Sequence, residues 1–195
     1  MFKNTTSIIR KPNKPTLKTI GIIPVTAPGG AMCYQAIVNR SIALYGGHHH
    51  PTICMHHHNF EEYHHAQSAG NWKRVAELLL DSAERVYKAG AEFGVIPANT
   101  MHRKEILEQL KQSPLPILSM LDVVAEYCHQ NNYSTIAILG TKWTMQDNIY
   151  KEALEKYGIK SLIPNKEEQA FLQTVIIDEL IPGKQTKNTE RNLLK

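Results

Sequence analysis

The sequence has few cysteines and no long apolar run. Its three cysteines (Cys33, Cys54 and Cys128) are widely spaced and odd in number, which fits neither a disulfide framework nor a paired zinc site. We therefore expect a reducing, cytoplasmic location. No apolar run approaches the roughly 20 residues of a membrane span, so we expect no membrane partner. The N-terminal stretch is too polar for a signal peptide and is broken by Pro12 and Pro15.

Most of the chain also lacks a large excess of either positive or negative charge. The net charge is +4, and the first eighteen residues carry five basic side chains, so the remainder is close to neutral. A nucleic-acid-binding protein would need basic residues clustered on its folded part, so we expect no nucleic-acid partner. Apolar residues make up 42% of the chain and charged residues 21%, a composition that favours a packed core over disorder.

The chain does contain a regular alternation of short apolar runs and amphipathic stretches. We predict strands at 19–23, 52–55, 93–96, 117–120, 135–139 and 159–163. We predict helices near 33–44, 72–89, 101–111, 121–131, 145–157 and 166–180, with another starting at 188. Such alternation is typical of parallel sheets covered by helices, in which ligands bind beyond the carboxyl ends of the strands. The loops at 24–30, 56–63, 97–102 and 140–144 are therefore candidates for a site.

The most informative of these loops is 97–102, which follows a predicted strand and opens a predicted helix. Backbone N–H groups at a helix start suit a carboxylate ligand, and the side chains of Asn99 and Thr100 add further donors. A capped helix with a solvated first turn would have the same sequence. Local chemistry alone leaves both interpretations open.

The order and spacing of several segments resemble those of the aspartate/glutamate (and hydantoin) racemases. Asn99 to His102, after Pro97, is similar to the first signature of that family. Further similar segments are 19–23, 55–63, 70–72, 139–145, 163–164 and 176–183, so that the resemblance covers 17–195. It implies an α/β fold of two similar lobes, each a mostly parallel sheet flanked by helices. On this basis we expect a loose arm at 1–16, a first lobe at 17–118 and a second, truncated lobe at 119–195.

The resemblance also implies cofactor-independent racemisation of a small acidic amino acid, in a site between the lobes. In such enzymes one thiol removes the α-proton and a second thiol on the opposite face returns one. Here Ala98 occupies the first cysteine position, and the second, in a Gly-Cys-Thr motif, would lie beyond residue 195. We therefore expect impaired activity with unknown catalytic residues. The alternative is an inactive remnant or a carboxylate-binding protein, and a homodimer follows by analogy.

By the same resemblance, Asn99, Thr100 and Thr141 would hold the substrate carboxylates. His56 would form part of the pocket wall, and His102 is a candidate helper in proton transfer or in orienting the substrate. These residues are the predicted site.

Histidine is the one residue type in clear excess, with ten in the chain and eight of them between His48 and His65. Successive residues of a strand point to opposite faces, so a triplet rarely forms one metal site. No cysteine or carboxylate completes a conventional motif, although Glu61 and Glu62 are near. We predict no metal site. Metal binding by the histidine-rich loop is the alternative.

Overall fold

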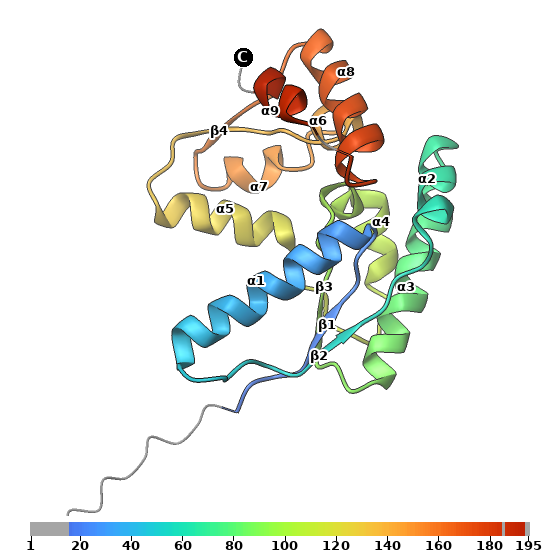
Figure 1. The fold of residues 1–195 in the computed structure, drawn as a ribbon, viewed down its shortest axis with the longest axis vertical. Coiled ribbons are helices and arrows are strands. Elements are labelled where there is room, and N and C mark those ends of the chain that lie inside the picture. The colour runs from blue at the N-terminus through green and yellow to red at the C-terminus, as the bar shows by residue number, and fades with distance from the viewer. Residues whose placement is uncertain (1–15, 185, 194–195) are drawn as a thin grey trace, which may run out of the picture.

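The computed structural model describes residues 16–184 and 186–193 as strands that alternate with helices (Figure 1). In the first sheet, β1 (Ile20–Ile22) lies between β2 (Ile53–Met55) and β3 (Phe93–Val95), and all pairs are parallel. In the second sheet, β4 (Thr135–Ala137) pairs in parallel with β5 (Lys160–Leu162). The predicted α/β class with parallel sheets is confirmed. The arm predicted for 1–16 falls, apart from residue 16, outside the described residues.

Helices flank both sheets. They are α1 (Ala27–Tyr45), α2 (Phe60–Ser68), α3 (Trp72–Lys88), α4 (Lys104–Leu110), α5 (Met120–Gln130), α6 (Lys142–Gln146), α7 (Lys151–Glu155), α8 (Lys166–Thr174) and α9 (Lys187–Leu193). Two irregular helices join them, the 3-10 helix η1 (Asn99–His102) and the π-helix η2 (Val175–Leu180). In Figure 1, α1 lies on one side of the first sheet, and α3 and α4 lie on the other. Within the described ranges, no helix has the length and hydropathy needed to cross a bilayer.

Helix α3 covers the first sheet with the face that its sequence predicts. Val75, Leu79, Ala83 and Val86 recur every three or four residues and are almost fully buried. The side chain of Asn71 caps the helix by accepting a hydrogen bond from the Arg74 N–H at 3.0 Å. The four buried residues of α3 belong to one hydrophobic cluster, which includes residues from 23 to 115. A second cluster, from 125 to 159, lies under β4 and β5. The lobe boundary at 118 stays a prediction.

The loop expected at 24–30 is shorter than predicted, because α1 already begins at Ala27 and includes residues 28–30. Pro28 is compatible with a first helical turn, where its missing N–H needs no partner. The Thr26 hydroxyl caps this turn by accepting from the Gly29 N–H at 3.3 Å. At Gly30 a Cβ would lie 2.8 Å from the Pro24 ring. The glycine therefore permits a close approach between the helix and the end of β1.

Helix α2 also differs from the prediction, which places residues 56–63 in a loop. It has no apolar period that predicts a helix, and its buried positions are Tyr63, Ala66 and Gln67. The Asn59 side chain caps it by accepting from the Glu61 N–H at 3.0 Å. Two residues of this helix, Phe60 and Gln67, line the candidate site described below.

Three further elements differ from the prediction. The strand expected at 117–120 is a single parallel bridge between Gly94 and Ile117, after which α5 starts at Met120. The helix expected at 101–111 breaks at Arg103 into η1 and α4. The helix expected at 145–157 is divided into α6 and α7, with Asn148 between them at a φ of 50°.

Asn165, followed three residues later by Glu168, predicts a capping box at the start of α8, and the structure contains it. Asn165 accepts hydrogen bonds from the N–H groups of Glu167 and Glu168, and the Glu168 carboxylate accepts from the Asn165 N–H. Helix α8 continues directly into η2, whose π-helical turn carries Ile176 and Ile177 toward the candidate site.

Candidate functional site

A cavity of about 220 Å³ lies where the segment after β3 meets the loop after β4. This volume is below the roughly 300–1,000 Å³ of pockets for drug-sized ligands, so it suits a small molecule. The cavity is lined by Pro97, Ala98, Asn99, Thr100 and Met101 from the first lobe, by Gly140, Thr141 and Thr144 from the second, and by Val25, Thr26, Phe60, Gln67, Ile176, Ile177 and Ile181 around them.

Three threonine hydroxyls join the two sides of this cavity. The Thr100 Oγ1 lies 3.0 Å from the Thr141 Oγ1 and 3.2 Å from the Thr144 Oγ1, and the last two atoms are 3.3 Å apart. Thr100 and Thr144 are buried, whereas Thr141 is half-buried. Each hydroxyl has one proton to donate and can accept, so the triangle retains free hydrogen-bonding capacity for a ligand. Two predicted site residues, Thr100 and Thr141, therefore meet directly.

Asn99 is held from the second lobe. The Tyr150 hydroxyl donates to the Asn99 Oδ1 at 2.5 Å. Burial raises the pKa of Tyr150 to about 12, so its hydroxyl remains a donor at neutral pH. Because the Oδ1 accepts this hydrogen bond, the side-chain NH₂ group of Asn99 is the part that can donate to a ligand in the cavity. An amide N–H is a suitable donor for a carboxylate.

A second junction lies beside the cavity. The Arg103 guanidinium stacks over the Trp72 ring at 4.1 Å from its centroid and forms an ion pair with Asp147. Trp72 also contacts Trp143 edge to face, with centroids 6.0 Å apart. A cation over an indole and an aromatic pair both stabilise the contact between the start of α3, the segment after β3 and the loop after β4. The mutual position of the 97–102 and 140–144 loops is therefore fixed by more than the threonines.

His102 is the last residue of η1 and is not among the residues that line the cavity. Its side chain is 1% exposed, and its Nε2 lies 3.1 Å from the Ile96 carbonyl oxygen. Burial lowers the pKa of His102, although the hydrogen bond to Ile96 opposes this effect, so the ring is neutral near pH 7. Its Nδ1 has no partner among the described residues. The geometry gives His102 a packing contact, and its predicted helper role remains untested.

His56 also lies apart from the cavity lining. Its Nδ1 is 3.1 Å from the Ser82 hydroxyl of α3, and His56 is not among the residues that line the cavity. Of the predicted site, the structure thus brings together Ala98, Asn99, Thr100 and Thr141. It does not bring His56 to them.

Sequence reasoning missed Tyr150, Thr144 and the isoleucines of η2. Thr144 lies in the loop at 140–144, which the sequence indicates as a candidate, but its contact with Thr100 is not predictable from it. Nothing in the sequence joins Tyr150 to Asn99, since 51 residues separate them. The lining has a further property that only the structure reveals. Among the described residues that line it, every side chain is uncharged, and none is a cysteine or histidine. A wider hollow of about 610 Å³ between α6 and α8 is formed by second-lobe residues alone.

Comparison with known proteins gives a consistent result. The family model of Asp/Glu/Hydantoin racemase matches residues 20–195. A crystal structure of a Yersinia pestis protein assigned to the Asp/Glu racemases has 28% identity and a TM-score of 0.76, covering 91% of this chain and 77% of that one. An aspartate racemase homologue from Pyrococcus horikoshii has 30% identity and a TM-score of 0.71, covering 90% and 76%.

A more distant structure shares the fold. Glutamate racemase from Francisella tularensis, in complex with D-glutamate, has 14% identity and a TM-score of 0.51. The match covers 75% of this chain and 52% of that one.

Proposed function

Because the chain belongs to the Asp/Glu/hydantoin racemase family, we propose that it binds a small acidic amino acid in the cavity between Ala98 and Thr141 and acts at its Cα. One observation carries the proposal: polar tips from both lobes converge on the cavity, with the Thr100 and Thr141 hydroxyls 3.0 Å apart. A ligand with two carboxylates can accept from donors on both sides at once. Enclosure of the ligand strengthens each of these hydrogen bonds, because it excludes water.

Each polar residue has a distinct part in this proposal. The Asn99 amide and the Thr100 hydroxyl donate to one carboxylate from the first lobe, and Thr141 donates to the other from the second. The apolar wall of Ile176 and Ile177 excludes water from the Cα. Binding and orientation are thus supplied by neutral donors, and no step requires a cofactor.

Proton transfer is the step for which the cavity is poorly equipped. Ala98 stands at the first base position and has no proton to exchange. The residues that line the cavity, among those described, include no group that titrates near neutral pH. This observation favours a second candidate function, carboxylate binding with little or no turnover. In either case the ligand class is the same.

Binding and turnover can be separated in one set of measurements. D- and L-aspartate and glutamate are added to the protein in deuterated water, and both the melting temperature and the deuterium at Cα are followed. We expect at least one of them to raise the melting temperature by roughly 5–10 °C at a hundred times its Kd. Slow deuterium incorporation would indicate residual racemase chemistry, and none would indicate binding alone. If no compound shifts the melting temperature or exchanges its proton, the proposed function is wrong.

Tyr150→Phe tests how Asn99 is held. The variant removes a hydroxyl that does not line the cavity, so it leaves the ligand contacts in place. We expect the affinity for the acidic amino acid to fall about 3- to 10-fold, because the Asn99 amide loses the bond that orients it. Titration calorimetry measures this change. The control is Tyr157→Phe, since Tyr157 is 40% exposed and does not line the cavity. Equal affinity in both variants would show that Tyr150 does not position Asn99.

Three further proposals concern the whole chain. We propose a cytoplasmic location, supported by three free cysteines. We propose a homodimer by analogy with similar folds. We propose lobes at 17–118 and 119–195, supported by the two separate hydrophobic clusters.

A further inference from the structure

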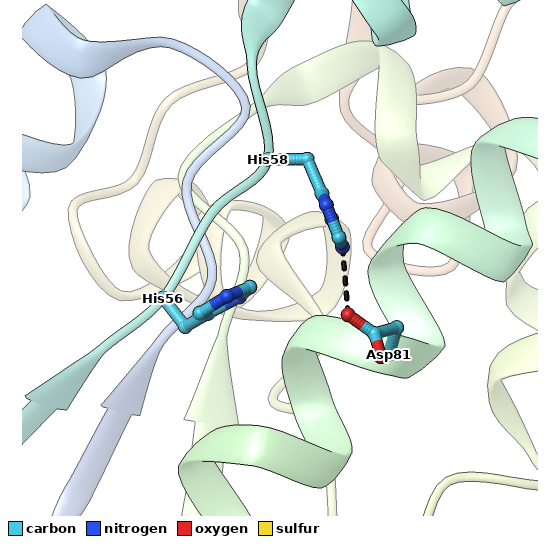
Figure 2. A group of neighbouring side chains, drawn as sticks. All are labelled: His56, His58 and Asp81. Atoms are coloured by element: carbon cyan, nitrogen blue, oxygen red, sulfur yellow. Dashed lines mark hydrogen bonds and ion pairs between the residues drawn. The ribbon is translucent and has the colours of Figure 1, made fainter.

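Two histidines and an aspartate gather beside the first sheet, away from the cavity. His56 and His58 follow β2, and because they are two residues apart in an extended segment they face the same side. Asp81 reaches them from α3 (Figure 2). One ligand atom from each of the three side chains lies within 4.8 Å of the others, and all three residues are half-buried.

We propose that His56, His58 and Asp81 bind a zinc ion. Two imidazole nitrogens and a carboxylate oxygen form a common ligand set for zinc, with the fourth position left to water. Ligands that bind at about 2.0–2.2 Å in a tetrahedron are roughly 3.3–3.5 Å apart. The His58 Nε2 and the Asp81 Oδ2 are 2.8 Å apart, so these two atoms must separate by roughly 0.5–0.7 Å to bind the same zinc ion. The widest pair of the group, which is at most 4.8 Å apart, must close by up to roughly 1.3–1.5 Å.

Polar groups outside the three ligands lie near the second nitrogen of each imidazole. A ligating histidine commonly uses its second nitrogen to bind a hydroxyl, a carbonyl or a carboxylate. The His58 Nδ1, opposite the nitrogen that faces Asp81, lies 4.0 Å from the Glu62 Oε1. The His56 Nδ1 lies 3.1 Å from the Ser82 hydroxyl. The His56 ring is thus held by a hydrogen bond from outside the three ligands, whereas the Glu62 carboxylate must approach the His58 Nδ1 by about 1 Å to form one.

The protonation states also suit a metal. Burial lowers the pKa of His56, and the positive charge of Arg85 lowers it further, so this ring is neutral at pH 7. The hydrogen bond from Arg85 lowers the pKa of Asp81, which is therefore ionised. Neutral imidazole and ionised carboxylate are the forms that bind a metal.

Arg85 is the one competitor for this site among the described residues near Asp81. Its Nε donates to the Asp81 Oδ2 at 2.7 Å, and its positive charge repels a cation. Its side chain is 57% exposed, and an exposed ion pair contributes little free energy, so Arg85 can move into solvent when zinc binds. Removing Arg85 should therefore tighten zinc binding.

Zinc at this position would stabilise a wall of the cavity. His58 stands two residues before Phe60, which begins α2 and lines the cavity. Fixing both histidines to α3 would hold the connection from β2 to α2 in one conformation. Zinc binding at these three residues requires no racemase reaction in the cavity.

The test uses the full chain without a polyhistidine tag, and ZnCl₂ as the ligand. We expect one zinc per chain by calorimetry and a rise in melting temperature of at least about 3 °C. His58→Gln and Asp81→Asn should each weaken binding at least tenfold, while melting without zinc shows that they fold. His57→Gln is the matched control, since the His57 Nδ1 lies at hydrogen-bond distance from the His58 carbonyl oxygen and not among the three ligands. This variant should leave zinc binding unchanged. Arg85→Gln should bind zinc more tightly.

Two results would overturn the proposal. The first is a wild-type chain whose melting temperature does not respond to zinc. The second is zinc binding that survives in both His58→Gln and Asp81→Asn but disappears when His48, His49 and His50 are replaced together. That pattern would assign the affinity to the upstream histidines, and the contact between His58 and Asp81 would then be an ordinary ion pair.

Discussion

Ala98→Cys is expected to exchange the α-proton of aspartate or glutamate with solvent at least about 100-fold faster than the native chain. A positioned acid–base group typically contributes a factor of roughly 10² to 10⁴. Ala98 lines the cavity beside Asn99 and Thr100, the residues proposed to hold a substrate carboxylate. A thiol at this position would stand against the Cα, where the native side chain has no proton to exchange. Deuterium incorporation at Cα, followed by proton NMR, measures the gain.

The local backbone favours a reactive thiol at this position. Residue 98 is extended, with φ −152° and ψ 111°, and it precedes the first turn of η1 without making a side-chain cap. Unpaired amide groups at the start of a turn stabilise a thiolate and lower its pKa. A single thiol acts on one face of the substrate. We therefore expect one enantiomer to exchange faster than the other.

The matched control is Ala98→Ser. Serine has the same shape, but its hydroxyl does not ionise near neutral pH and cannot act as a base without a partner. Exchange in Ala98→Ser should stay at the native rate. Equal rates in the serine and cysteine variants would show that residue 98 does not face the Cα. Unchanged ligand-induced melting shifts in both variants would show that the cavity itself remained intact.

Leu79→Ala is expected to lower the free energy of unfolding by about 3 kcal/mol, within the range of 2–5 kcal/mol for such changes. Leu79 is 0% exposed and lies on the face of α3 that packs over the first sheet. The substitution removes apolar contacts and leaves a void that close-packed neighbours cannot fill. For a chain of this size the melting temperature should fall by roughly 6–12 °C. Thermal and urea denaturation measure the two quantities.

The same substitution at an exposed position separates burial from helix propensity. Leu44 lies near the end of α1 and is 58% exposed. We expect Leu44→Ala to change the free energy of unfolding by no more than about 0.5 kcal/mol. A large loss at Leu44 would mean that α1 is covered in solution. A small loss at Leu79 would mean that α3 does not pack as described.

The sequence by itself determined the elements whose cause is local. The buried face of α3 follows from apolar residues every three or four positions, and the capping box at Asn165 and Glu168 follows from two side chains three residues apart. The short apolar strands and their parallel pairing follow from alternation with helices. Where the prediction failed, as at 28–30 and 145–157, the local pattern was ambiguous and a cap or a turn decided the boundary.

Only the tertiary structure decided which side chains meet. The Thr100 hydroxyl reaches Thr141 across 41 residues, and Tyr150 reaches Asn99 across 51. Asp81, which is 23 residues after His58 in the chain, reaches it from α3. Helical and strand periods are set by backbone hydrogen bonds between near neighbours, so they are visible in the sequence. Contacts between loops depend on how whole layers pack, and no short window of sequence contains that information.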